Sequence, residues 1–171
     1  MANEEQIKII KQGVDTWNSW RIDNPSISPD LTRADLRGLK LQKINLNKAL
    51  LESAKLQFSN FYGANFENAC LEKAKLKEAI LTGANLKGAK IAGGNMLESN
   101  LQNANLENAD LQGAQFNEDT NFNGVNLQGA NLKGATGLGV DQVKASFVNE
   151  KTILPDYLDD EMEGEDFLMR L

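Results

Sequence analysis

Residues 99–113 read SNLQNANLENADLQG, and the five-residue unit in this stretch, A-(N/D)-L-x-x, recurs from Leu31 to Leu132. A large apolar residue returns at every fifth position, with a small residue, most often alanine, two places before it. Eighteen such centres run from Leu31 to Phe116, and three more follow one residue late, at Phe122, Leu127 and Leu132. Helices repeat at about 3.6 residues and strands at about two, so neither explains this period. A unit this short must stack on copies of itself to build a core.

The unit resembles the repeat of the pentapeptide-repeat family, as in ADLRG at 34–38, ANLKG at 84–88 and ADLQG at 109–113. The resemblance implies an all-β solenoid, a right-handed quadrilateral β-helix with four pentapeptides per coil and about five coils in this chain. Residues i and i+20 then lie one above the other. The stretches WNSWRIDNP at 17–25 and PDL at 29–31 are similar to N-terminal extensions of uncharacterised bacterial, especially cyanobacterial, members. Low-complexity disorder is disfavoured, because disordered segments lack such regularly spaced large apolar residues.

Length and composition suit one globular domain of 171 residues, 41% of them apolar and 25% charged. We divide the chain into an N-terminal capping helix and linker at 1–28, the β-helix at 29–134, a C-terminal cap at 135–155 and an acidic tail at 156–171. No apolar run is long enough for a signal peptide or a membrane span, which predicts a cytoplasmic protein. The single cysteine, Cys70, agrees with a reducing compartment.

The N-terminal segment is predicted to form one amphipathic helix over residues 3–18, since Ile7, Ile10, Val14 and Trp17 share a face. Asn3 is the expected N-cap. An open solenoid end exposes core side chains and strand edges, so we expect this helix to cover it. The proline-containing stretch 21–31 is read as a linker.

At the other end, we expect a short helix at 141–146 and an extended segment at 148–154. The apolar residues expected to cover this end are Val140, Val143, Phe147, Ile153 and Leu154. Covers at both ends predict a monomer. The acidic tail is expected to be solvated, and a less favoured alternative is that it docks on a basic surface.

Two details of the repeats carry structural predictions. Asparagine precedes every centre of the fourth face, and stacked amides can form a hydrogen-bonded ladder; these residues are Asn45, Asn65, Asn85, Asn105 and Asn126. The register breaks between Phe116 and Phe122, where one extra residue is interpreted as a bulge at a corner.

The inventory of reactive side chains argues against an enzyme. The chain contains no histidine, which excludes Ser-His-Asp and Cys-His arrangements and histidine metal sites. The carboxylates are scattered, and the stacked pair Glu52 and Glu72 lacks a cleft. The stretch GATGLG at 134–139 lacks the lysine of a phosphate-binding loop. We therefore predict no catalytic residue, no cofactor and no metal.

The predicted function is a protein-interaction or scaffold module that presents rigid walls to a partner protein. The alternative, which the resemblance implies, is a DNA mimic that modulates a type II topoisomerase with a rod of negative charge. The net charge of −6 has the sign that mimicry needs, but residues 29–134 hold twelve basic and eleven acidic side chains and are near neutral. The acid lies mainly after residue 134, which disfavours the mimic.

One wall is basic, with Arg37, Lys55, Lys75 and Lys77 on the second face and Arg33 and Lys73 at its corner. These cations are few and lack adjacent stacking aromatics, so direct nucleic-acid binding is not expected.

The predicted partner patch consists of outward residues that are not polar. Phe58, Tyr62 and Ile80 should gather around one edge, with Gln42 and Thr82 at the rim and Gly63 and Gly83 beside them. Isolated exposed apolar residues are ordinary on soluble proteins, which is the competing interpretation. Grouped aromatics on a rigid wall are typical anchors of protein interfaces.

Overall fold

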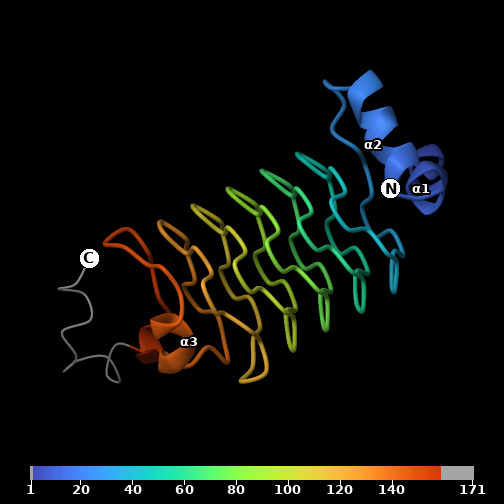
Figure 1. Ribbon diagram of the computed structural model, residues 1–171. Helices are drawn as coiled ribbons and strands as arrows, with labels where there is room; N and C mark the ends of the chain where they lie inside the picture. Colours follow the sequence, from blue (N-terminus) through green and yellow to red (C-terminus); the bar gives the residue numbers. More distant parts are fainter. Residues whose placement is uncertain (1, 159–171) are drawn as a thin grey trace.

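The computed structural model describes residues 2–158 of the chain. Its helices are α1 (Glu4–Lys11), α2 (Val14–Asp23), α3 (Val140–Lys144) and the 3-10 helix η1 (Asp156–Leu158). Between α2 and α3 the chain winds as a stack of narrow coils, with α1 and α2 at one end and α3 at the other (Figure 1). The prediction of a solvated acidic tail over 156–171 is wrong at its start, because residues 156–158 form η1, where Leu158 is buried and the Tyr157 hydroxyl donates to the carbonyl of Leu138 at 2.9 Å. Residues 159–171, with the expectations placed on them, lie outside the described residues.

Parallel β-bridges join the coils at a spacing of twenty residues, as in Asn45↔Asn65 and Asn65↔Asn85. Four bridges occur per coil, one on each side, because a turn follows every bridge residue and its neighbour. The bridge residues define four faces. They begin with Asp30, Leu50 and Cys70 on the first face, Asp35, Lys55 and Lys75 on the second, Lys40, Asn60 and Ile80 on the third, and Asn45, Asn65 and Asn85 on the fourth.

The repeat unit follows from the shape of one side of the coil. The centre and the alanine of each unit are buried, while the residue between them faces outward at the bridge. The two following residues turn the corner, and the second of them has a positive φ, as at Gly38 (65°). The next alanine N–H then bonds back to the centre, as from Ala34 to the carbonyl of Leu31 at 3.0 Å. This is the geometry of a type II turn.

Asparagine or aspartate before the centre has a local role at these corners. Its side-chain oxygen accepts a hydrogen bond from the N–H two residues on, as from Glu67 to Asn65 at 3.0 Å and from Gln112 to Asp110 at 3.1 Å. The predicted ladder of amides forms only in part. Asn85 donates to Asn65 at 3.4 Å and Asn126 donates to Asn105 at 3.2 Å. The turn bond therefore explains the residue preference better than the ladder does.

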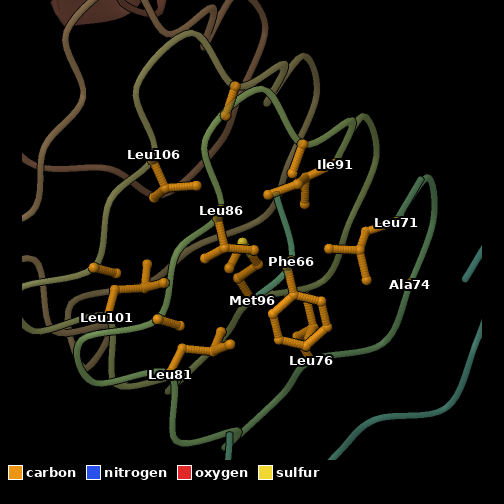
Figure 2. Close-up of a cluster of buried hydrophobic side chains, with 14 of the residues drawn as sticks. Phe66, Leu71, Ala74, Leu76, Leu81, Leu86, Ile91, Met96, Leu101 and Leu106 are labelled. Carbon is orange, nitrogen blue, oxygen red and sulfur yellow. The ribbon is translucent and has the colours of Figure 1, made fainter. Parts of the chain in front are cut away.

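The core is one continuous cluster of the centres and alanines from all coils. Figure 2 shows centres such as Leu76, Leu86 and Met96 pointing into the interior of the coils. Phe61 and Phe66 meet edge to face, with ring centroids 5.0 Å apart. Successive coils thus share a dry interior, which holds the outer walls at a fixed spacing.

The extra residue between Phe116 and Phe122 lies at a corner, and the next bridge, Asn100↔Asn121, spans twenty-one residues. Thr120 takes the buried alanine position. Its hydroxyl donates toward the carbonyl of Met96 at 3.2 Å, and it also accepts from the Asn117 N–H at 3.1 Å. We call this arrangement the Asn-Thr clasp. It recurs between Asn149 and Thr152, whose hydroxyl reaches the carbonyl of Leu127 at 2.9 Å.

The prediction of one helix over residues 3–18 is wrong. Gly13, with φ 115°, separates α1 from α2, and α2 continues to Asp23, into the stretch predicted as a linker. The predicted N-cap is confirmed, because the Asn3 side chain accepts from the Gln6 N–H at 3.1 Å. A glycine in this conformation ends a helix that the apolar spacing alone would continue.

The two helices hydrogen-bond to the open edge of the first coil. The Trp17 indole N–H donates to the carbonyl of Asn45 at 2.7 Å, and the Asn45 N–H donates to the side chain of Asn18 at 2.9 Å. On the first face, the Asp30 N–H donates to the Gln6 side chain at 2.7 Å. Main-chain groups of the edge on the first and fourth faces are thereby satisfied.

At the opposite end, two of the five apolar residues expected to cover the core point outward. Phe147 is 61% exposed and Ile153 is 49% exposed, whereas Val143 is buried. The reason is that the stack continues past residue 134, with bridges Asn126↔Phe147 and Asn131↔Ile153. Phe147 and Ile153 occupy outward bridge positions, and Val148 takes a buried centre.

Candidate interaction surface

The predicted partner patch, which we call the aromatic corner, consists of Phe58, Tyr62 and Ile80. All three are exposed, at 57%, 50% and 41% respectively. Phe58 precedes the third face at its corner, Tyr62 follows it in the same coil, and Ile80 lies one coil above Asn60 through the bridge Asn60↔Ile80. The structure therefore places the three residues around one face.

Phe58 has a backbone conformation that the sequence reasoning missed. Its φ is 62°, in the left-handed region that glycine adopts at Gly38 and that ten other non-glycine residues, Glu78 and Glu98 among them, also adopt at corners of the stack. Phe58 is the aromatic residue of this set, and a Cβ in this conformation crowds the following carbonyl. The signal was present in the sequence, because Phe58 has the same phase in its repeat as Gly38.

The backbone under the aromatic corner is anchored from within. Ser59 replaces the usual alanine and is fully buried. Its hydroxyl donates to the carbonyl of Leu36 at 2.6 Å and accepts from the Leu39 N–H at 3.2 Å. This side chain ties the second coil to the first directly beside Phe58. These two bonds fix the backbone next to the ring to the first coil.

The residues around the aromatic corner leave it accessible to a partner. The predicted rim residues Gln42 and Thr82 are half-buried, and Gly63 and Gly83 are exposed. A Cβ added to Gly83 would meet nothing within 4 Å. Both glycines also have positive φ, so their corners require them for the turn as well.

The predicted basic face divides into paired and unpaired cations. Arg37 donates from Nε to Asp35 Oδ1 at 2.8 Å and from a terminal nitrogen to Asp35 Oδ2 at 2.6 Å. These bonds lower the pKa of Asp35 to about 2. Lys77 lies 3.1 Å from Glu98 and 3.6 Å from Glu78, and the bond with Glu98 raises the pKa of Lys77.

Lys55 and Lys75 remain without an ion pair among residues 2–158. Both are exposed and occupy bridge positions in direct register, Lys55↔Lys75. Arg33 and Lys73, at the corner that precedes the second face, are also exposed and unpaired within the described part of the chain.

The described residues also include a cleft near α3. This cleft, of about 320 Å³, lies between the clasp corner and α3, lined in part by Glu118, Asp119 and Asp141. Within residues 2–158, no three His, Cys, Asp or Glu side chains are arranged to hold a metal ion. No helix in this range has the length and apolar character needed to cross a membrane.

Comparisons with known proteins place this geometry in a family. The model of pentapeptide repeats matches residues 30–68, 59–96 and 99–136, in eight copies and over more than half of the chain. None of the curated proteins that were searched matches the chain.

Solved structures give the same picture. The crystal structure of HetL, a pentapeptide repeat protein involved in heterocyst differentiation regulation from the cyanobacterium Nostoc sp. strain PCC 7120, matches with a TM-score of 0.63 and 28% identity, over 72% of this chain and 56% of HetL. The chain thus spans a little over half the length of HetL. A pentapeptide repeat protein from the Arabidopsis thaliana thylakoid lumen matches with a TM-score of 0.42 and 29% identity, over 70% of this chain and 74% of that protein. The chain therefore belongs to the pentapeptide repeat family, whose fold is the right-handed quadrilateral β-helix.

Proposed function

We propose that this protein is a non-enzymatic interaction or scaffold module whose aromatic corner anchors a partner protein. The observation that carries the proposal is the exposed ring of Phe58, at a corner next to the exposed Tyr62 and Ile80. Left-handed backbone costs a residue with a Cβ about 1 to 2 kcal/mol, and a ring in water gains nothing in return. Glycine or a polar residue fills the same position at other corners of the stack, as at Gly38 and Glu78, so the fold itself does not require a ring there.

A partner would compensate both costs. Burial of the Phe58 ring against an apolar pocket of the partner would release the free energy of removing that ring from water. Large aromatic side chains often dominate interface energies. Tyr62 and Ile80 widen the apolar area, while Gln42 and Thr82 supply polar groups at its rim. The bond network of Ser59 holds the anchor in place before binding, which limits the entropy lost on association.

The remaining parts of the proposal concern the whole module. We infer about five coils closed by α1 and α2 at one end and by the segment from α3 onward at the other, a monomeric state and a cytoplasmic location. Cyanobacterial origin likewise stays a prediction. We also keep the division at residues 28, 134 and 155 as an inference, with the bridges of the stack continuing past residue 134 to Phe147 and Ile153.

A DNA-mimicking modulator of a type II topoisomerase is the less favoured alternative. Residues 29–88 hold ten basic and six acidic side chains, and residues 89–158 hold four basic and eight acidic. A mimic needs negative charge along its whole body, and the first half of this stack has the opposite sign.

The test is a capture experiment from native cells with a stability control. Phe58→Asn relieves the backbone, since asparagine tolerates the left-handed region, and should raise the free energy of unfolding by up to about 1 kcal/mol. The double variant F58N/Y62S should lose the proteins that the wild-type protein captures, as identified by mass spectrometry. Ile22→Ser, at a 78% exposed site on α2, is the control and should retain them. Undiminished capture by F58N/Y62S removes the aromatic corner from the proposal.

A further inference from the structure

Lys55 and Lys75 form a stacked pair of like charges. Lys55 lies across a bridge from Asp35 and helps to lower the pKa of that carboxyl, whereas Lys75 has no ion pair among residues 2–158. Their bridge puts the two backbones about 4.8 Å apart, the spacing of neighbouring strands. Like charges directly opposite each other destabilise a sheet. The neighbouring cations Arg37 and Lys77 have carboxylate partners, and Asp35, one coil below Lys55, already binds Arg37.

The stacked pair is part of a longer strip across one wall. Arg33 and Lys73 stand at the corner before the second face, and Phe58 stands at the corner after it. We call Lys55, Lys75, Arg33 and Lys73 the lysine strip. The strip leads directly to the aromatic corner, so a ligand that lies across the wall meets cations first and an apolar surface next.

The charge of the whole stack limits the length of such a ligand. The excess of basic side chains ends near residue 88, and the coils above it carry Glu98, Glu107 and Asp110. A long polyanion that continued along the stack would meet this negative half. The strip therefore fits a short anionic segment that is confined to the first three coils.

We propose that the lysine strip binds an acidic segment of the partner protein, with carboxylates facing Lys55 and Lys75 and an adjoining apolar side chain on the aromatic corner. The inference rests on the proposed function and specifies the chemistry of the partner. A polypeptide is favoured over nucleic acid because a short acidic segment can be confined to the basic first three coils, whereas a polynucleotide that continued along the stack would meet the negative half. Phe58 and Tyr62 also offer ring faces to bases, so the oligothymidylate probe tests this preference.

The experiment measures binding of fluorescent probes to the full-length protein by anisotropy. The probe is a short peptide in which glutamate alternates with phenylalanine and leucine. The comparison probes are the same peptide with glutamine in place of glutamate, and single-stranded oligothymidylate. We expect the acidic peptide to bind, the glutamine peptide to bind at least about tenfold more weakly, and added salt to weaken the acidic peptide alone.

Matched variants locate the binding. The variant K55Q/K75Q should bind the acidic peptide about tenfold more weakly, the loss expected for two exposed ion pairs. The variant K48Q/K90Q removes the same charge from other walls and should bind as the wild type does. Because the four lysines are exposed, circular dichroism and the urea midpoint should show that all variants fold.

The outcomes separate this inference from the proposed function. Tighter binding of oligothymidylate that depends on Lys55 and Lys75 would overturn the inference in favour of nucleic acid. Equal binding of the two peptides, or of both lysine variants, would also overturn it. If K55Q/K75Q keeps the captured partner while F58N/Y62S loses it, the proposed function stands and the acidic chemistry is wrong. If both variants keep the partner, both proposals fail.

Discussion

At the scale of single residues, the stack depends on how closely one corner approaches the next coil. Gly134 and Gly137 both have positive φ, 67° and 75°. A Cβ added to Gly134 meets nothing within 4 Å, but one added to Gly137 overlaps the carbonyl group of Phe116 in the coil below. Gly134 is thus required for its dihedral angle alone. Gly137 is required both for its dihedral angle and because a Cβ would not fit beside the main chain of Phe116.

Alanine substitutions should separate these two reasons. Gly134→Ala should lower the free energy of unfolding by about 1 kcal/mol, the cost of a left-handed alanine. Gly137→Ala adds a clash with main chain that cannot rotate away, so we expect a loss at least about 2 kcal/mol larger. Urea denaturation of both variants measures the difference. Equal losses would show that the main chain at Phe116 yields without cost.

The pair of Asp35 and Arg37 gives a prediction for pH. The hydrogen bonds from Arg37 hold the pKa of Asp35 at about 2, below its usual value of about 3.9. A lowered carboxylate pKa means that the pair stabilises the fold above the unfolded pKa, and that this contribution is lost as the pH falls from about 4 to about 2. NMR titration of the Asp35 carboxyl carbon should give a midpoint near 2. Arg37→Gln should return it toward 3.9, while Lys77→Gln should leave it unchanged.

At the scale of elements, α2 matters most through one tryptophan. Trp17 is fully buried, stacks near Trp20 with ring centroids 5.2 Å apart, and donates to the carbonyl of Asn45. It therefore joins the helix to both the core and the edge of the first coil. Asn18 and Arg21 also bond the helix to the first coil, but Trp17 is the residue that both fills the core and satisfies the edge.

Two substitutions should separate those roles. Trp17→Phe keeps an aromatic ring but removes the indole bond, and should cost about 1 to 3 kcal/mol because the Asn45 carbonyl loses its donor. Trp17→Ala also empties the site, and should cost about 3 to 5 kcal/mol and promote self-association through the exposed end. Denaturation and size-exclusion chromatography measure the two effects. A monodisperse W17A protein of unchanged stability would show that α2 does not cover the core.

The sequence predicted the repeats well because every unit buries the same two positions and turns the same kind of corner. The buried centre, the small residue and the corner all follow from a five-residue period. The five-residue period no longer predicts which residues are buried where the alanine position is filled by another residue or where a residue is added. Ser146 and Thr152 replace alanine in the last units, and the second Asn-Thr clasp adds a residue, so Phe147 and Ile153 were expected inside and lie outside.

The candidate site was predictable to a similar degree. Phase in the repeat identified Phe58, Tyr62 and Ile80 as outward residues, and their exposure agrees. Position in the repeat could not show which cations have partners, because a long side chain can reach several carboxylates in neighbouring coils. Lys77, for example, reaches Glu98 of the next coil, twenty-one positions further along the chain.

At the scale of the whole molecule, charge is distributed along the axis of the stack. The net charge is positive over residues 29–88 and negative over residues 89–158. Such a distribution orients the approach of a charged partner and favours contact with the basic half by anionic surfaces. It is also the main physical argument against mimicry of DNA.

A topoisomerase assay tests that argument. Because a uniform negative rod is absent from the described coils, purified protein at micromolar concentration should neither inhibit nor protect a supercoiling type II topoisomerase. The comparison variant replaces the acidic residues of 159–166 by their amides. Inhibition that persists in this variant would restore the mimic, and inhibition that vanishes with it would assign the effect to those residues alone.

The direction of the coil-to-coil hydrogen bonds has a mechanical consequence. These bonds run along the stack, and α1 and α3 lie at its opposite ends (Figure 1). A pulling force applied between the two ends would load all the layers in series with the same tension, so that the weakest layer opens first. Each coil contacts only its neighbours, which makes such opening sequential. The protein should therefore be stiff under sideways contact with a partner and weak under axial tension.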